Sequence, residues 1–321
     1  MSATKSAWMF PGQGSQRPGM GTDIRGIAVA HDIFTCASDI FGFDVEALCT
    51  ISDAEAIGKA RHAQVAVATT SIALAEALYQ RGVEPSVLLG FSLGQISALA
   101  ASRMLSIEAT FRLLEVRARC MAEAAHETPG AMCALIGADE ASATALCEAC
   151  ALGGVLVIAN YNCPGQIVVS GSFAAVERAE DAWRKQGKRC SRLACAGAFH
   201  SPLMASAKRV FASHLATCTF EEPCTLVIGN TDAAPLTAAT ARQCLADHLT
   251  HPVRFEQSVA LARRLGTTDF LEIGCGGVLS HLVRRIDKNL KRAAVEDVAS
   301  LQAAVCAYGT MHNTDEEKLN G

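Results

Sequence analysis

The chain has 321 residues, 50% of them hydrophobic and 19% charged, and it carries a formal net charge of −4. This length and composition fit a globular enzyme of one large domain or two modest ones, and the acidic balance argues against a nucleic-acid-binding protein. No apolar run has the length of a membrane span and no signal-peptide core follows Met1, so we expect neither a membrane segment nor secretion. The 14 cysteines follow no repeated spacing, which predicts a reduced, cytoplasmic location.

The first predicted strand, residues 7–10, leads into a glycine-rich loop at 11–21. The loop lacks the G-K-[ST] ending of a P-loop, and Gly19 comes too late for a dinucleotide fingerprint. Its backbone amides can approach a ligand closely because glycine has no side chain, but the pattern alone favours an ordinary loop. Helical patterns follow at 23–41 and 65–79.

The stretch 86–101 predicts a strand, a sharp turn and a helix around Ser92. A short apolar strand precedes Gly90, Gly94 follows the serine, and the alanine-rich sequence beyond it is helical by propensity. A G-x-S-x-G turn in this setting exposes a serine hydroxyl at the carboxyl edge of a sheet, and the amide of Leu93 at the helix N-terminus can face a developing oxyanion. The pattern also arises by chance, but the flanking strand and helix favour a nucleophile.

A further helix is predicted at 107–125, with Arg117 beside its apolar positions. An arginine in this position usually extends its charged end to water, so this is the default interpretation, and it changes only if the substrate carries a carboxylate. Basic clusters at 184–189 and 284–292 are typical of solvated helix faces, although an acidic protein partner could use either.

Residues 129–195 predict a small inserted domain. The predicted elements are strand 131–136, helix 141–151, strands 155–160 and 166–170, helix 173–186 and strand 189–193. This β-α-β-β-α-β order is the split βαβ unit of ferredoxin-like domains. Cys147 and Cys150 form the single C-x-x-C pair within it, and because no second pair or histidine cluster lies nearby, we predict small buried thiols and no metal site.

After the insertion, His200 lies in a loop before a helix that begins near Pro202. A single histidine among nine is more often a surface or packed residue than a base. The remaining predicted elements are strand 225–229, helices 238–249 and 255–265, strand 269–273 and helix 278–286. Strands that alternate with helices predict a mostly parallel sheet. We therefore expect a discontinuous catalytic domain, 1–128 and 196–309, and a disordered tail at 310–321.

Several stretches together resemble the malonyl-CoA:acyl carrier protein transacylase family, which includes free-standing acyltransferases of fatty acid and polyketide synthesis. They are 10–16, the Ser92 turn, Arg117 with Met121, 130–132, 160–166, 197–204 and 272–274. Because they follow the family's order over nearly the whole chain, the series is more specific than any one motif.

The resemblance implies an α/β-hydrolase-like large domain with a parallel sheet, interrupted by a ferredoxin-like small domain, with the active site between them. It implies Ser92 as nucleophile, His200 as base, the backbone amides of Gln13 and Leu93 as oxyanion hole, and Arg117 as the partner of the malonyl carboxylate. Arginine suits this role because it can meet a carboxylate with two parallel hydrogen bonds.

The resemblance further implies that a backbone carbonyl near residues 251–254 orients the histidine. No permanently bound cofactor is expected: malonyl-CoA is the donor and the phosphopantetheine of an acyl carrier protein is the acceptor. We expect a monomer with no nucleic-acid or membrane partner.

Two positions depart from the family, which usually has histidine at Phe91 and glutamate at Gln95. These changes leave the acyl specificity open, so a transferase for a specialised acyl group also fits. Phe199, just before the histidine, is associated in the family with malonyl rather than methylmalonyl selection. Three different functions compete with acyl transfer: an acylhydrolase that edits acyl carrier proteins, a lipase or esterase that shares only the serine turn, and a scaffold subunit without catalysis.

Overall fold

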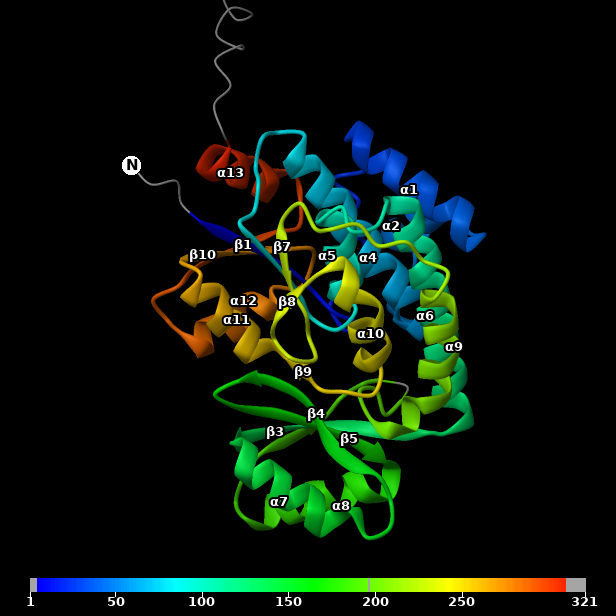
Figure 1. The fold of residues 1–321 in the computed structure, drawn as a ribbon, viewed down its shortest axis with the longest axis vertical. Coiled ribbons are helices and arrows are strands. Elements are labelled where there is room, and N and C mark those ends of the chain that lie inside the picture. Colours follow the sequence, from blue (N-terminus) through cyan, green and yellow to red (C-terminus); the bar gives the residue numbers. More distant parts are fainter. Residues whose placement is uncertain (1–4, 196, 310–321) are drawn as a thin grey trace, which may run out of the picture.

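The computed structural model describes residues 5–195 and 197–309, and the predicted tail at 310–321 lies outside them. Its strands form two sheets, a larger one in the upper part of Figure 1 and a smaller one in the lower part. The strands are β1 Ser6–Phe10, β2 Val87–Gly90, β3 Gly130–Ala138, β4 Leu156–Cys163, β5 Gly165–Ser172, β6 Cys190–Arg192, β7 Leu226–Ile228, β8 Pro235–Leu236, β9 Val253–Arg254, β10 Asp269–Ile273 and β11 Lys291–Val295.

The larger sheet has the order β11-β10-β1-β2-β7-β8. All its pairs are parallel except β7 with β8, so the predicted α/β class with a mostly parallel sheet is confirmed. Helices cover the larger sheet on both sides, and two helices lie on one face of the smaller sheet (Figure 1). The helices are α1 Ala28–Phe41, α2 Val45–Thr50, α3 Ala54–Gly58, α4 Ala60–Tyr79, α5 Gly94–Ala101, α6 Ile107–Glu127, α7 Glu140–Ala151, α8 Phe173–Lys185, the 3₁₀ turn η1 Pro202–Met204, α9 Ala205–Leu215, α10 Ala238–His248, α11 Phe255–Arg264, α12 Val278–Ile286 and α13 Val298–Tyr308. None of these helices is both long enough and apolar enough to cross a membrane.

Alternation along the central strands explains why helices cover both faces. Trp8 and Phe10 of β1 pack in one hydrophobic core with α1, α4, α5 and α6, whereas Ala7 and Met9 pack in another with α11 and α12. Successive side chains of a strand point to opposite faces, so a strand that is apolar at every position needs cover on both sides. Because β1, β2 and β7 run parallel, the site residues that follow these strands emerge together at the sheet's carboxyl edge.

The smaller sheet has the order β6-β3-β5-β4-β9, with α7 and α8 on one face, and its first four strands show the predicted ferredoxin-like arrangement. Cys147 and Cys150 are buried in this layer, as predicted. The fifth strand, β9, comes from later in the chain and pairs in parallel with β4, which the sequence did not predict. Its two residues are too few to produce a strand pattern. The domain boundaries 129–195 stay a prediction.

Other elements differ from expectation at their ends. Helix α1 begins at Ala28 rather than at 23, because the preceding residues form turns, and α4 begins at Ala60 rather than at 65. The short helices α2 and α3 were not predicted, although the side chains of Asp44 and Asp53 cap their N-termini. Strand β11 and helix α13 were also missed.

Candidate active site

Ser92 lies in the sharp turn between β2 and α5, which confirms the predicted strand, turn and helix. Its φ of 51° is in the left-handed region, which is rare for a residue with a side chain. A Cβ on Gly90 would lie 2.1 Å from the backbone nitrogen of Gln95, and one on Gly94 would lie 2.0 Å from the carbonyl oxygen of Phe10. Only glycine fits at these two positions, so the motif is a packing requirement of the turn.

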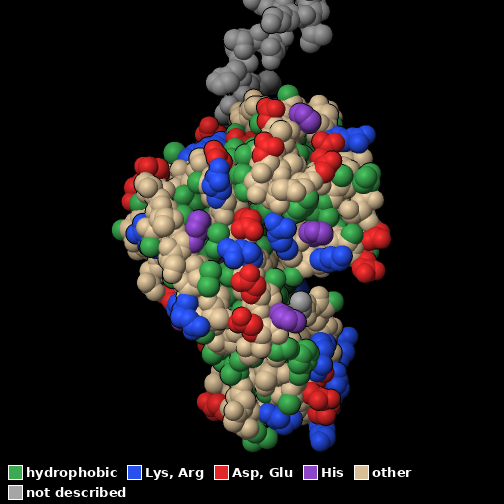
Figure 2. Space-filling model, turned by 90° about the vertical axis from the view of Figure 1, so that its right-hand side faces the viewer, with side chains coloured by type: hydrophobic (Ala, Val, Ile, Leu, Met, Phe, Trp, Pro, Cys, Tyr) green, Lys and Arg blue, Asp and Glu red, His purple; other side chains and the backbone are tan. Residues whose placement is uncertain are grey.

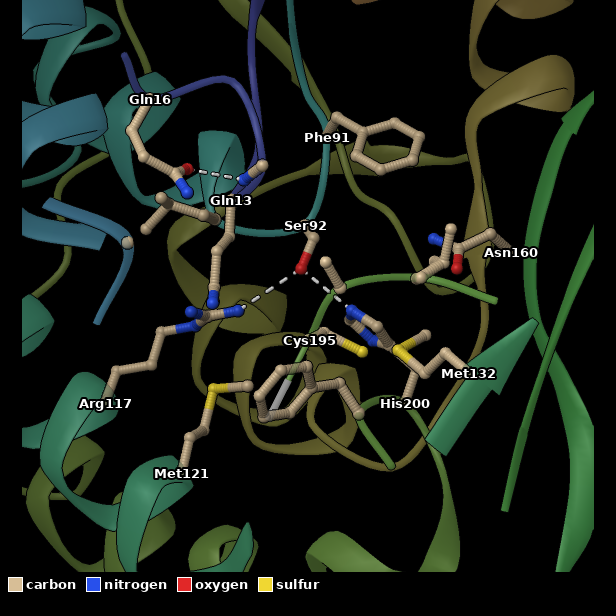
Figure 3. Close-up of a pocket in the computed structure, with 16 residues that line it drawn as sticks. Gln13, Gln16, Phe91, Ser92, Arg117, Met121, Met132, Asn160, Cys195 and His200 are labelled. Atoms are coloured by element: carbon tan, nitrogen blue, oxygen red, sulfur yellow. Dashed lines mark hydrogen bonds between the residues drawn. The ribbon is translucent and has the colours of Figure 1, made fainter. Parts of the chain in front are cut away.

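The structure brings Ser92 and His200 together across 108 residues of sequence: Ser92 Oγ lies 2.8 Å from His200 Nε2 (Figure 3). On the other side of the ring, His200 Nδ1 lies 2.9 Å from the carbonyl oxygen of His248 and 3.1 Å from that of His251. Carbonyl oxygens only accept hydrogen bonds, so Nδ1 carries the proton. His200 Nε2 is therefore free to accept the serine proton.

His200 is held in a buried loop just before η1, with φ 58° and 3% of its surface exposed. Burial, reinforced by the nearby charge of Arg117, lowers its pKa to about 4, so the imidazole is neutral at pH 7. The family resemblance implied an orienting carbonyl near residues 251–254. His251 lies in that range, but the shorter contact comes from His248, the last residue of α10.

Arg117 projects from α6 into the same site and is 2% exposed, so its default interpretation as a water-facing side chain is wrong. Its guanidinium donates hydrogen bonds to Gln64 Oε1 and, at 3.4 Å, to Ser92 Oγ. None of the ion pairs among residues 5–195 and 197–309 includes Arg117. Burial lowers its pKa to about 10, so it still carries a positive charge at pH 7.

Gln13 and Leu93 both line the cavity beside Ser92. Leu93 precedes the first turn of α5, where helix amides point outward. The loop that carries Gln13 passes so close to the Ser92 turn that a Cβ on Gly12 would lie 2.7 Å from the carbonyl oxygen of Phe91. The glycine-rich loop is therefore part of the site, and the sequence pattern alone did not distinguish it from an ordinary loop.

A cavity of about 320 Å³ joins these residues. Its wall also includes residues from strands, helices and loops of both parts of the chain (Figure 3): Gln16, Gly58, Phe91, Met121, Met132, Asn160, Cys195 and Phe199. The surface in Figure 2 narrows between the larger upper part and the smaller lower part. Positive and negative side chains are interspersed on that face, which agrees with the weakly acidic composition.

The two positions that depart from the family lie differently with respect to the cavity. Phe91 lines it and packs edge-on against Phe255, with ring centroids 5.5 Å apart. Gln95 is fully buried behind the turn, where its Oε1 accepts a hydrogen bond from the backbone N–H of Asn230. Gln95 therefore does not form part of the cavity wall.

Sequence reasoning missed two residues of the site, Gln64 and Asn230. Gln64 lies on α4, whose residues from Ala63 to Leu78 are nearly all buried. A polar side chain in such a run signals a buried partner, here Arg117. Asn230 follows β7, beside the Ser92 turn, and a polar residue just past a buried strand was the available signal.

The chain matches a family model described as acyl transferase domain over residues 7–314. The malonyl CoA-acyl carrier protein transacylase of Bacillus subtilis strain 168 is 37% identical over 306 residues, which are 94% of this chain and 96% of that protein. The solved complex of a malonyl-transacylase with its type II polyketide synthase acyl carrier protein has a TM-score of 0.91 at 36% identity and covers 95% of this chain and 100% of that one. The malonyl-CoA:acyl carrier protein transacylase of Xanthomonas oryzae pv. oryzae has a TM-score of 0.92 at 34% identity and covers 97% and 100%. The chain therefore belongs to the malonyl-CoA:acyl carrier protein transacylase family of acyl transferase domains.

Proposed function

We propose that this chain transfers a malonyl group from CoA to the phosphopantetheine thiol of an acyl carrier protein, with Ser92 as the covalent carrier. The observation that supports this best is the buried guanidinium of Arg117, which has no carboxylate partner among the described residues and lies 3.4 Å from the nucleophile. A buried charge without a partner is costly, and a substrate carboxylate removes that cost. An enzyme for neutral acyl chains has no use for this group.

In the first half-reaction, His200 Nε2 takes the proton of Ser92 as Oγ attacks the thioester carbonyl of malonyl-CoA. The negative charge that develops on the carbonyl oxygen is stabilised by the backbone N–H groups of Gln13 and Leu93. The C–S bond then breaks, the CoA sulfur receives the proton from His200, and free CoA leaves. The malonyl group remains as an ester on Ser92, with its carboxylate on Arg117.

In the second half-reaction, the phosphopantetheine thiol gives its proton to His200 and its sulfur attacks the serine ester. The ester C–O bond breaks, and Ser92 Oγ recovers a proton from His200. The His248 and His251 carbonyls accept from Nδ1–H throughout, so they hold the ring in place and stabilise its positive charge. These two backbone carbonyls orient the imidazole of His200, as a carboxylate does in a Ser-His-Asp triad.

The comparisons support both the donor and the acceptor. The relatives named above are malonyl-CoA:acyl carrier protein transacylases, and one solved relative is bound to its acyl carrier protein. A malonyl thioester has a carbonyl to be attacked and a carboxylate, and the small cavity offers a nucleophile, Ser92, and a cation, Arg117.

Intact-protein mass spectrometry after brief incubation with malonyl-CoA tests the proposal. The wild type should gain the mass of one malonyl group, Ser92→Ala should gain none, and added holo acyl carrier protein should remove the group as malonyl-carrier protein. A wild type that stays unmodified refutes the assignment. Free malonate released as fast as CoA, without transfer to a carrier protein, indicates an acylhydrolase instead.

A further inference from the structure

Asn230 lies at the end of β7, beside the serine turn. Strands β2 and β7 are parallel neighbours, and Leu89 is paired with Ile228, so the residues that follow both strands meet at one edge of the sheet. The Asn230 side chain bridges two residues of the turn. Its Oδ1 accepts from the backbone N–H of Ser92 at 2.8 Å, and its Nδ2 donates to the carbonyl of Gly90 at 2.7 Å.

This bridge holds the strained part of the site. Ser92 has a positive φ, a conformation that persists only where the surroundings fix it. Asn230 is 2% exposed, so water cannot readily replace its side chain. Without the bridge, the partly buried N–H of Ser92 and the buried carbonyl of Gly90 would lose this partner.

The backbone of Asn230 connects the turn to the loop that orients the base. Its N–H donates to Gln95 Oε1 at 2.9 Å, and its carbonyl accepts from the backbone N–H of Arg254 at 2.9 Å. Arg254 belongs to β9, three residues after His251, whose carbonyl contacts His200 Nδ1. Asn230 therefore bonds to the Ser92 turn on one side and, on the other, to β9, the strand that follows the loop of His251.

We infer that Asn230 is a positioning residue of the acyl-transfer reaction. It sets Ser92 relative to His200 by holding the serine turn against β9, the strand that follows the loop whose His251 carbonyl orients His200. This inference rests on the proposed acyl-serine mechanism. It gives Asn230 no contact with substrate. Its effect is on the reactivity of the Ser92 hydroxyl.

Asn230→Asp separates this role from a merely structural one. A protonated aspartic acid can reproduce both bonds, because its C=O accepts from Ser92 N–H and its O–H donates to the Gly90 carbonyl. An ionised aspartate places an oxygen against that carbonyl and loses the second bond. Reactivity of this variant should therefore recover as pH falls, whereas Asn230→Ala has no group that can recover.

The ionisable groups tied to this segment do not mask that signal. Arg254 Nε donates to the carbonyl of Thr231, and Cys244 Sγ lies 3.2 Å from Thr231 Oγ1. Burial raises the pKa of Cys244, with a smaller contribution from Asp232. All of them are present in wild type and variants alike, so the ratio of variant to wild-type rates isolates residue 230.

The measurement is the rate at which a fluorophosphonate labels Ser92 between pH 5.5 and pH 8, which reports the hydroxyl's reactivity without any thioester. At pH 8 both variants should react at least roughly tenfold more slowly than wild type. Between pH 8 and pH 5.5 the Asn230→Asp ratio should rise by at least about fivefold, as its carboxyl takes a proton. Thermal melting checks that each variant is folded, and Asn289→Asp, on the exposed surface, is the matched control.

Folded variants that label as fast as wild type overturn the inference. So does an Asn230→Asp ratio that is independent of pH. Failure of the proposed function looks different, because wild type would then react with the fluorophosphonate but gain no malonyl group from malonyl-CoA. In that case the same ratios of labelling rates would still test whether Asn230 positions Ser92.

Discussion

Arg117→Ala removes the buried cation that faces Ser92, and the substrate carboxylate is then left without a partner in the cavity. Breaking a buried charge pair from one side costs about 3–5 kcal/mol. Because Arg117 is 2% exposed, solvent screening does little to reduce this figure. At 1.36 kcal/mol per factor of ten, kcat/KM for malonyl-CoA should fall by about 10²- to 10⁴-fold. For acetyl-CoA, which has no carboxylate, no such loss is expected, so the preference for malonyl-CoA should collapse.

The assay measures kcat/KM for CoA release from malonyl-CoA and from acetyl-CoA, with holo acyl carrier protein as acceptor. Arg119→Ala is the matched control, because Arg119 lies on the same helix with 50% of its side chain exposed and only surface ion pairs. The substitution of Arg117 also leaves Gln64 Oε1 without its donor, so a thermal melt must show that the variant is folded. A folded variant that keeps the wild-type preference for malonyl-CoA would refute the role of this arginine.

Three further predictions concern the base, the turn and the wall of the cavity. In the free enzyme His200 has a pKa lowered to about 4 and accepts a proton only when neutral, so kcat/KM for acylation, which reports the free enzyme, should stay constant from pH 7 to about pH 5 and fall towards pH 4. A fall of kcat/KM near pH 6.5 in rapid-quench measurements at subsaturating malonyl-CoA would contradict the buried, neutral imidazole of the free enzyme. Gly94→Ala places a Cβ 2.0 Å from the carbonyl oxygen of Phe10 and should cost about 3 kcal/mol or more in urea unfolding. Gly26→Ala, whose Cβ meets nothing within 4 Å, should cost much less, and equal losses would argue against the packing account. Phe199→Ala removes a ring from the cavity wall, so the kcat/KM ratio of methylmalonyl-CoA to malonyl-CoA should rise at least about tenfold. An unchanged ratio would mean that this ring does not limit the α-substituent.

The serine turn could be predicted from the sequence because its requirements are local. A strand, two glycines and a helix start occupy one stretch, and Gly90 is dictated by a contact within that stretch, with Gln95, although Gly94 is dictated by Phe10 of the neighbouring strand β1. The ferredoxin-like order of strands and helices was readable for the same reason, since each element carries its own periodicity. Of the strands of the smaller sheet, β9 was the one not predicted, because its two residues form a strand through pairing with β4.

The rest of the site depends on contacts between distant segments. Arg117 has the pattern of a surface arginine, and its burial is decided by α4, which supplies Gln64 fifty-three residues away in sequence. Family resemblance predicts a substrate-binding role for Arg117, whereas residue pattern alone does not. Asn230 and the His248 carbonyl have no motif of their own, because what they contribute is a position at the edge of the sheet or the end of a helix.

The charge of Arg117 also connects substrate choice to the strength of the base. Burial and Arg117 together lower the pKa of His200, so in the free enzyme the imidazole is a weak base. A carboxylate bound to Arg117 neutralises that charge and raises the pKa of His200 towards its ordinary value, which strengthens it as the acceptor of the Ser92 proton. A neutral acyl group leaves Arg117 unpaired and the base weak. In the proposed mechanism, selection for a malonyl group therefore acts on the chemical step as well as on binding, because the same cation would contact the substrate and tune the residue that activates the nucleophile.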